Sequence, residues 1–411
     1  MRPSLLPTLL LALAVAACAP DTTPDGAAGL AAAPAGTFAV PAGAGASAPR
    51  LALDEGGRPL LSWTEPEGDG HALRYAVWAD TGWAAARTGD VGTGRFINWA
   101  DTPGVVPLGG GRLLAHVLTM HPDGDSPYAY DVAVRLADAD GRWSAPLTPH
   151  TDGTATEHGF VSAVPLGAGA GLVWLDGREM AGGHGGHGHG GGAMTIRYAA
   201  IGPDGALSDE AVLDARTCDC CPTAMVATAD GPVVAYRDRS ADEVRDVAVV
   251  RRVGGAWTRP HVPHADGWRI DGCPVNGPAL AARGRRVALA WYTAADGAPR
   301  VHVALSDDGG AAFGPAVRVD GGAPVGRVGV ALRPDGSAVV TWLEDVGGDR
   351  AEVRVRVLAP DGALGEPTTV ATTASGRSSG VPHVLALGDR VLVAWTDPEA
   401  AVPVQSTVVA L

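Results

Sequence analysis

Four of the five cysteines lie in two short segments, where they could bond to one another or hold a metal ion. Cys218, Cys220 and Cys221 belong to Thr-Cys-Asp-Cys-Cys-Pro, and Cys273 belongs to Asp-Gly-Cys-Pro-Val-Asn-Gly-Pro. An even number of cysteines in an oxidising compartment predicts disulfides first. Because the adjacent Cys220 and Cys221 do not readily bond to each other, Cys273 is expected to pair with a member of the other segment. The alternative is a metal site, since thiolates bind soft ions such as Cu and Zn.

Histidines form a second group of metal-ligand candidates. His184, His187 and His189 lie in a glycine-rich tract, residues 182–190, and His158 lies in a predicted connection, residues 156–158. Imidazoles together with thiolates suit Cu, Zn or Ni. A His-rich tract is also a compositional signal with many false positives, so an unused low-complexity insertion is the other interpretation of residues 182–190.

The scaffold for these residues is predicted by an internal repeat. A short apolar strand with a Trp or an equivalent residue near its end recurs at a spacing of about fifty to sixty residues, which is typical of propellers and solenoids. An alternating strand follows, and then a Gly with a bulky apolar residue, which favours a hairpin. The seven copies, of which the second is weaker, occupy residues 60–63, 113–118, 172–174, 233–236, 287–291, 339–342 and 391–395.

Seven copies predict an all-β fold, a seven-bladed β-propeller of four-stranded antiparallel blades, with a six-bladed ring as the alternative. The last copy ends at Leu411 without an outer strand, and residues 36–41 resemble that missing strand. We expect this N-terminal strand to pair with the last blade and close the ring, which leaves only short sheet edges. The repeated Trp side chains are expected in the core between blades.

Strand direction sorts the loops of such a ring between two faces. The loop between the second and third strands of a blade leaves on the same face as the connection to the next blade. Loops on a rigid scaffold often bind ligands, and here these segments are rich in Cys, His, Asn, Arg and acids. Asn98, Asn276, Arg245 and His383 are the predicted ligand-face residues. The segments are residues 96–101, 120–123, 156–158, 176–194, 217–222, 237–246, 271–276, 325–327, 344–345 and 381–383.

One hairpin turn matches a known motif. Ser306, Asp308, Gly310 and Phe313 fit the Asp-box pattern S-x-D-x-G-x-x-(W/F), and through them the chain resembles the sialidase-like β-propeller superfamily. The Asp and Gly of this motif shape a turn, which the strand rule places on the opposite face. The two cysteine-containing segments resemble a bacterial lipoprotein subgroup that is named sialidase-like without a demonstrated reaction. Resemblance of fold does not by itself imply function.

A sialidase would imply a six-bladed ring, three arginines that bind a carboxylate, a Tyr–Glu nucleophile pair and an Asp acid/base. Three observations oppose this function: the repeat has seven copies, only one Asp box is complete, and Tyr236 occupies the position of a core Trp. An exo-α-sialidase-type glycoside hydrolase is therefore kept as an alternative. The catalytic candidates that the resemblance implies are Arg237, Asp238, Arg327 and Glu344, with Arg245 and Tyr236 nearby.

Composition excludes several other functions. All 31 basic residues are arginine, so the chain has no lysine for a Schiff base or a P-loop. The formal net charge is −14. This charge opposes a nucleic-acid partner, because phosphate binding depends on a basic face.

The N-terminus has the pattern of an exported lipoprotein. Residues 1–17 combine an early Arg with a short apolar run, which predicts a signal peptide. Residues 15–18, Val-Ala-Ala-Cys, resemble a lipobox, which implies cleavage before Cys18 and lipidation of its thiol. Ala19 favours the outer membrane of a bacterial cell envelope, on the periplasmic or surface side. An ordinary secretory signal is the alternative. Residues 18–36 predict a flexible tether, and residues 37–411 a single domain.

These features predict a lipid-anchored extracytoplasmic propeller that binds a ligand or a metal ion, such as Cu or Zn, at a face rich in Cys and His. The expected contact with the membrane is through the lipid only. A small ligand, a glycan or a metal is the expected partner, and no nucleic acid. A protein-interaction scaffold is the second alternative to this function.

Overall fold

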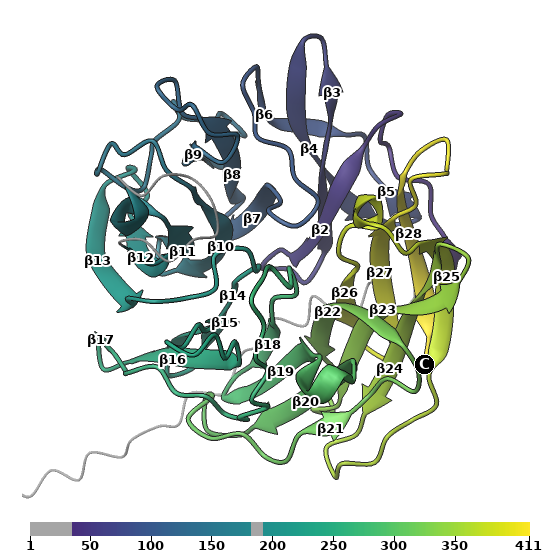
Figure 1. Cartoon of the computed structure of the whole chain (residues 1–411). Coiled ribbons are helices and arrows are strands. Elements are labelled where there is room, and N and C mark those ends of the chain that lie inside the picture. The colour runs from purple at the N-terminus through teal and green to yellow at the C-terminus, as the bar shows by residue number, and fades with distance from the viewer. Residues whose placement is uncertain (1–34, 182–191) are drawn as a thin grey trace, which may run out of the picture.

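The computed structural model describes residues 35–181 and 192–411, which form seven β-sheets arranged around a centre (Figure 1). The innermost strands of successive sheets contact one another around the complete circle, and the first contacts the last. The predicted seven-bladed propeller is therefore confirmed, and the six-bladed alternative is wrong. Within the described part of the chain, no helix is both long and apolar enough to cross a bilayer.

The first four blades run in sequence order from the inner to the outer strand. Blade 1 contains β2 (Ser47–Leu53), β3 (Pro59–Glu67), β4 (Gly70–Ala79) and β5 (Gly82–Trp83), with β6 (Arg87–Gly92) also paired to β4. Blade 2 contains β7 (Gly104–Gly109), β8 (Arg112–Met120) and β9 (Tyr130–Ala137). Blade 3 contains β10 (His158–Leu166), β11 (Gly169–Asp176), β12 (Thr195–Ile201) and β13 (Leu207–Asp214). Blade 4 contains β14 (Ala224–Thr228), β15 (Gly231–Arg237), β16 (Val247–Val253) and β17 (Ala256–Trp257).

The remaining blades complete the ring, and three short 3₁₀ helices lie in connections. Blade 5 contains β18 (Ala279–Arg283), β19 (Arg286–Thr293), β20 (Arg300–Ser306) and β21 (Val317–Arg318). Blade 6 contains β22 (Pro324–Leu332), β23 (Ala338–Gly347), β24 (Arg350–Leu358) and β25 (Thr368–Ala374). Blade 7 contains β26 (His383–Leu387), β27 (Arg390–Thr396), β28 (Val404–Ala410) and β1 (Gly36–Thr37). The helices are η2 (Arg178–Met180), η3 (Ala295–Gly297) and η4 (Arg377–Ser379).

The core lies between adjacent blades. In β24, Ala351, Val353 and Val355 are fully buried while the residues between them are not, as the two-residue period of a strand requires. Trp342 of blade 6 packs with residues of blade 5 in one apolar cluster. The predicted core position of the repeated Trp residues is confirmed, and each apolar side chain buried in this way stabilises the ring by about 1.5–3 kcal/mol.

Three blades share a Trp–acid pair at the end of the second strand. The indole nitrogen is buried, and a carboxylate two residues later accepts its hydrogen, because a buried donor without a partner is costly. The pairs are Trp63 to Glu65 at 2.9 Å, Trp174 to Asp176 at 2.8 Å and Trp342 to Glu344 at 2.6 Å.

The Asp box forms the predicted turn between β20 and β21. Ser306 Oγ donates to Asp308 Oδ1 at 2.8 Å, and the same carboxylate oxygen accepts from two backbone amides, Ala311 and Ala312. Gly310 takes a φ of 78°, which a side chain would strain. Phe313 packs against the core between blades 4 and 5, so the motif is structural.

The ring closes between the two ends of the described chain. Gly36 pairs with Val408 and Thr37 with Thr407, both antiparallel. The backbone of Phe38 continues the pairing, because its N–H donates to the Ser406 carbonyl at 3.0 Å. The predicted closure by an N-terminal strand is confirmed.

Candidate functional site

The two cysteine segments meet at one place on the ring. Cys218, Cys220 and Cys221 lie on the connection from blade 3 to blade 4, and Cys273 lies on the next connection, from blade 4 to blade 5. Cys218 Sγ lies 3.5 Å from Cys221 Sγ and 3.8 Å from Cys220 Sγ. The Cys273 thiol donates to Asp219 Oδ1 at 3.9 Å, and these two side chains and Cys220 present ligand atoms within 4.8 Å of one another. The predicted proximity of the two segments is confirmed.

The disulfides expected from the even cysteine number are absent from the part of the chain that the structure describes. The two sulfur–sulfur distances of 3.5 and 3.8 Å far exceed the roughly 2.05 Å of a disulfide bond. The sulfurs form two overlapping groups, Cys218 with Cys220 and Cys221, and Cys220 with Cys273 and the Asp219 carboxylate. We call the four cysteines the thiol cluster.

The electrostatics of the thiol cluster divide the four thiols into two kinds. Contacts with Cys220 and Cys221, followed by the charge of Arg245, hold the pKa of Cys218 well below its ordinary value. Contact with Cys220 also lowers the pKa of Cys273. Contacts with Cys218, Cys221 and Cys273 raise the pKa of Cys220, and burial raises that of Cys221. Cys218 and Cys273 are therefore the thiols that are biased toward the thiolate form.

Arginines and an acid from blade 4 support this charge. Arg245 Nη1 donates to Cys218 Sγ at 3.3 Å, and its Nη2 donates to Glu243 Oε2 at 2.9 Å. Arg239 also binds Glu243, at 2.8–3.1 Å through two nitrogens. These residues lie on the loop between β15 and β16 within blade 4. This loop and the two inter-blade connections together surround the thiol cluster. Arg245, a predicted ligand-face residue, thus contacts sulfur.

A cavity of about 100 Å³ opens where inner strands of several blades begin. The predicted ligand-face residues Asn276 and His383 line it together with Arg327 and with Asp101, which belongs to the predicted segment 96–101, whereas sequence reasoning missed Arg50 and Thr223. The strands bulge here: Ala48 of β2, Phe160 of β10 and Arg327 of β22 take φ values of 55°, 53° and 57°. Non-glycine residues with positive φ concentrate at functional positions.

The cavity borders a buried acid pair bridged by a tyrosine. Tyr130 Oη lies 2.8 Å from both Asp101 Oδ2 and Glu157 Oε1. One phenolic proton cannot serve two carboxylates at once, so one acid must be protonated. Burial raises the pKa of Asp101 to about 7 and that of Glu157 to about 8, and it raises the pKa of Tyr130 as well. The unit therefore holds an extra proton near neutral pH.

The catalytic candidates implied by the sialidase resemblance have local partners. Arg237 donates to the carbonyls of Asn276, Tyr292 and Arg245 at 2.6–2.9 Å and lies over Trp268. Arg327 donates to Gly376, Ser379 and Gly380 and lies over Trp99. Glu344 accepts the indole hydrogen of Trp342, and burial raises the pKa of Asp238 to about 6. Each of the two guanidinium groups is thus occupied by backbone or hydroxyl oxygens of neighbouring segments.

The two predicted asparagines shape backbone. Asn98 Oδ1 accepts from the amides of Ala100 and Asp101, which fixes the turn that carries Asp101 to the cavity. Asn276 Oδ1 accepts from the Arg327 amide at 2.7 Å, which joins two connections. Burial lowers the pKa of His383 to about 3, so this cavity residue is neutral.

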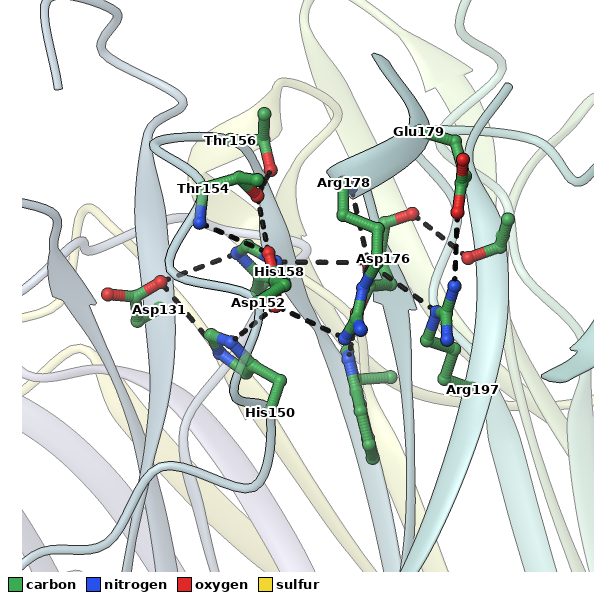
Figure 2. A network of polar contacts seen from close by, with 12 residues as sticks. Asp131, His150, Asp152, Thr154, Thr156, His158, Asp176, Arg178, Glu179 and Arg197 are labelled. Atoms are coloured by element: carbon green, nitrogen blue, oxygen red, sulfur yellow. Dashed lines mark hydrogen bonds and ion pairs between the residues drawn. The ribbon is translucent and has the colours of Figure 1, made fainter. Parts of the chain in front are cut away.

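His158 lies apart from the thiol cluster, in a group with His150 and three aspartates (Figure 2). Its carboxylate neighbours are Asp131, Asp152 and Asp176. Sequence reasoning missed His150 and Asp131, although a His-x-Asp sequence eight residues before His158 was a usable signal. The other predicted histidine ligands, His184, His187 and His189, lie outside the described residues, as does Cys18.

Comparisons with known proteins give a likeness of fold. No family model and no curated protein matches the sequence. Among solved structures, the NanB sialidase from Streptococcus pneumoniae has 9% identity and a TM-score of 0.45, over 86% of this chain and 83% of its own. A protein of unknown function from Dyadobacter fermentans has 13% identity and a TM-score of 0.47, over 91% and 97%. AofleA from Arthrobotrys oligospora has 10% identity and a TM-score of 0.47, over 82% and 89%. At such identities the likeness concerns the fold alone.

Proposed function

We propose that this protein is a metal-binding β-propeller whose thiol cluster holds one soft or borderline ion, Cu(I) or Zn²⁺. The observation that supports this function is the group of three thiols, Cys218, Cys220 and Cys221, whose member Cys220 also lies close to Cys273 on the next inter-blade connection. Sulfurs around a tetrahedral Zn²⁺ at about 2.3 Å lie about 3.8 Å apart. The spacings of 3.5 and 3.8 Å around Cys218 match that value.

The surroundings of the sulfurs suit a thiolate site. Metal binding requires deprotonated thiols, and Cys218 is already biased toward its thiolate form. The Arg245 guanidinium offsets part of the negative charge that additional thiolates would add. Three rigid blades supply the connections, so the donors are positioned before the ion arrives.

We infer further that the ring is tethered to a bacterial cell envelope, with the outer membrane favoured, through a lipid on Cys18. The Val-Ala-Ala-Cys sequence at residues 15–18 supports this location. The membrane contact is through the lipid only, and the net charge of −14 opposes a nucleic-acid partner. Labelled fatty acid should be incorporated by the full chain and not by Cys18→Ser. Equal labelling of both proteins would exclude the anchor.

Metal analysis tests the proposed function. The full-length protein, purified under reducing conditions without chelator, should contain one equivalent of Cu or Zn that depends on the thiol cluster, in addition to any metal bound elsewhere. A variant in which His184, His187 and His189 are changed to Gln should therefore keep that equivalent. Adding Cys218→Ser and Cys273→Ser should remove it, whereas Cys18→Ser, the same chemical change elsewhere, should not. Equal metal content with and without the two thiols would overturn the proposal.

Sialidase-type hydrolysis is the second candidate, favoured by one observation. A tyrosine and two acids adjoin a cavity that contains Arg50 and Arg327. Burial raises the pKa of Tyr130, however, which opposes the ionised form that a nucleophile needs. Release of a fluorescent aglycone from a sialoside, abolished by Arg327→Ala, would establish this activity. Metal binding alone predicts no release.

A further inference from the structure

A second group of possible ligands lies between blades 2 and 3, and we call it the His–Asp cluster (Figure 2). It draws on three strands and one inter-blade connection. Asp131 lies on β9, His150 and Asp152 lie on the connection to blade 3, His158 begins β10, and Asp176 ends β11. Both histidine side chains are almost completely buried, with exposures of 5% for His150 and 0% for His158.

Asp152 hydrogen-bonds to the imidazole of His158 and lies close to that of His150. His158 Nε2 hydrogen-bonds to Asp152 Oδ2 at 3.2 Å, and His150 Nδ1 lies 3.3 Å from Asp152 Oδ1. The carboxylate is itself held by the hydroxyl and the amide of Thr154 and by Arg178 Nη2 at 3.1 Å. Histidines that bind metal usually donate their second ring N–H to a carboxylate in this way, which fixes the tautomer.

The two remaining ring nitrogens face a second carboxylate. His158 Nδ1 lies 3.4 Å and His150 Nε2 lies 3.8 Å from the same oxygen, Asp131 Oδ1. Neither nitrogen makes a hydrogen bond of good geometry, although both are buried. Buried ring nitrogens without a good hydrogen bond are costly unless something else binds them. The three atoms lie within 4.8 Å of one another, close enough to share one ion.

We propose that His150 Nε2, His158 Nδ1 and the Asp131 carboxylate bind a borderline divalent transition ion of the Zn²⁺ class, in a site separate from the thiol cluster. Imidazole and carboxylate donors suit this class, whereas Mg²⁺ and Ca²⁺ prefer oxygen ligands alone. Asp152 acts as the orienting carboxylate. Asp131, whose side chain is 25% exposed, lies on the side from which an ion enters.

Ion binding must change the packing of the two rings. They are stacked with centroids 3.9 Å apart and planes 8° from parallel. One ion cannot lie in two parallel ring planes at that separation, so at least one ring must rotate about its side chain to present its lone pair. The proposal therefore includes loss of the stack when the ion binds.

Cobalt substitution separates the two sites, because Co²⁺ bound by thiolates has strong charge-transfer absorption and Co²⁺ bound by N and O donors does not. The parent for this test is full-length, reduced protein with His184, His187 and His189 changed to Gln, so that the glycine-rich tract does not bind. This parent should bind one equivalent in an N/O environment in addition to any thiolate-bound ion. His158→Gln should lose the N/O equivalent and keep any charge-transfer band, whereas Cys218→Ser with Cys273→Ser should show the reverse.

Graded variants keep the test decisive if His158→Gln folds poorly. Asp131→Asn removes a half-buried ligand and should also abolish the N/O equivalent. Asp152→Asn removes only the orienting carboxylate and should weaken Co²⁺ or Zn²⁺ affinity by about 10–100-fold. Circular dichroism of each variant checks folding. Unchanged affinity of folded Asp131→Asn and Asp152→Asn, or no N/O equivalent in the parent, would overturn this site whatever the thiol cluster does.

Discussion

The thiol cluster and the His–Asp cluster use similar loops for different chemistry. The thiol cluster takes its cysteines from two inter-blade connections. The His–Asp cluster takes its residues from one inter-blade connection and from β9, β10 and β11. In the thiol cluster an arginine, Arg245, contacts a donor atom directly. In the His–Asp cluster the arginine, Arg178, contacts the carboxylate of Asp152, which is not one of the proposed metal ligands. The blades thus fix where donors gather, and local residues decide which ion they suit.

Removal of Arg245 should have the largest effect and should affect only one cluster. Arg245→Ala leaves the buried Cys218 thiolate without its cation, while Glu243 keeps Arg239, so we expect a loss of about 3–5 kcal/mol in the free energy of unfolding. Urea denaturation measures this loss. The control is Arg58→Ala, whose surface ion pair should change stability by less than about 1 kcal/mol. Equal effects of the two changes would show that Arg245 is not a buried counter-ion.

The acids between the two clusters should make stability fall as pH rises. The pKa of Asp101 is about 7 in the folded protein, against roughly 3.9 unfolded. The folded state therefore holds more protons between about pH 4 and pH 7, and up to about 4 kcal/mol of stability is lost across that range. Asp101→Asn should flatten the dependence, as followed by denaturation at several pH values. The same dependence of stability on pH in the wild type and in Asp101→Asn would contradict the assignment.

The Trp–acid pairs allow a matched comparison between blades 3 and 6. Asp176→Ala and Glu344→Ala each leave a buried indole N–H unpaired, so each should cost about 1–3 kcal/mol. Asp176 also lies 3.8 Å from His158 Nε2, whereas Glu344 belongs to another blade. Only Asp176→Ala should therefore weaken Zn²⁺ binding, measured by calorimetry. Equal Zn²⁺ affinity in both variants would show that Asp176 does not contribute to ion binding by the His–Asp cluster.

The Asp box should give the smallest effect. Asp308→Ala removes a partly buried acceptor of two turn amides, and we expect a loss of about 0.5–1.5 kcal/mol. Metal content should stay unchanged, because this turn contacts neither cluster. A thermal unfolding scan with metal analysis of the same sample checks both expectations. Loss of metal in Asp308→Ala would show that the turn supports a cluster.

The internal repeat made the fold predictable from the sequence. The His–Asp cluster was not predicted, because most of its residues lie outside the repeat. Seven recurring strands determine a ring, and the ring brings Cys273 to the other cysteines, although it does not decide between a disulfide and a metal. His150, Asp131 and Asp152 lie outside the repeat, and although His150 and Asp152 form a His-x-Asp sequence, only the meeting of blades 2 and 3 brings Asp131 to them. Arg50 was missed because it lies within a strand, and its exposure to the cavity depends on a bulge.

The pairing of β1 with β28 also sets when the protein can finish folding. Gly36 and Thr407, which share a hydrogen bond, are 371 positions apart, so the first described strand must wait for the last one to be synthesised. Contacts this distant in sequence slow folding. Until then β1 has no strand to pair with, so the closure of the ring depends on the last residues of blade 7.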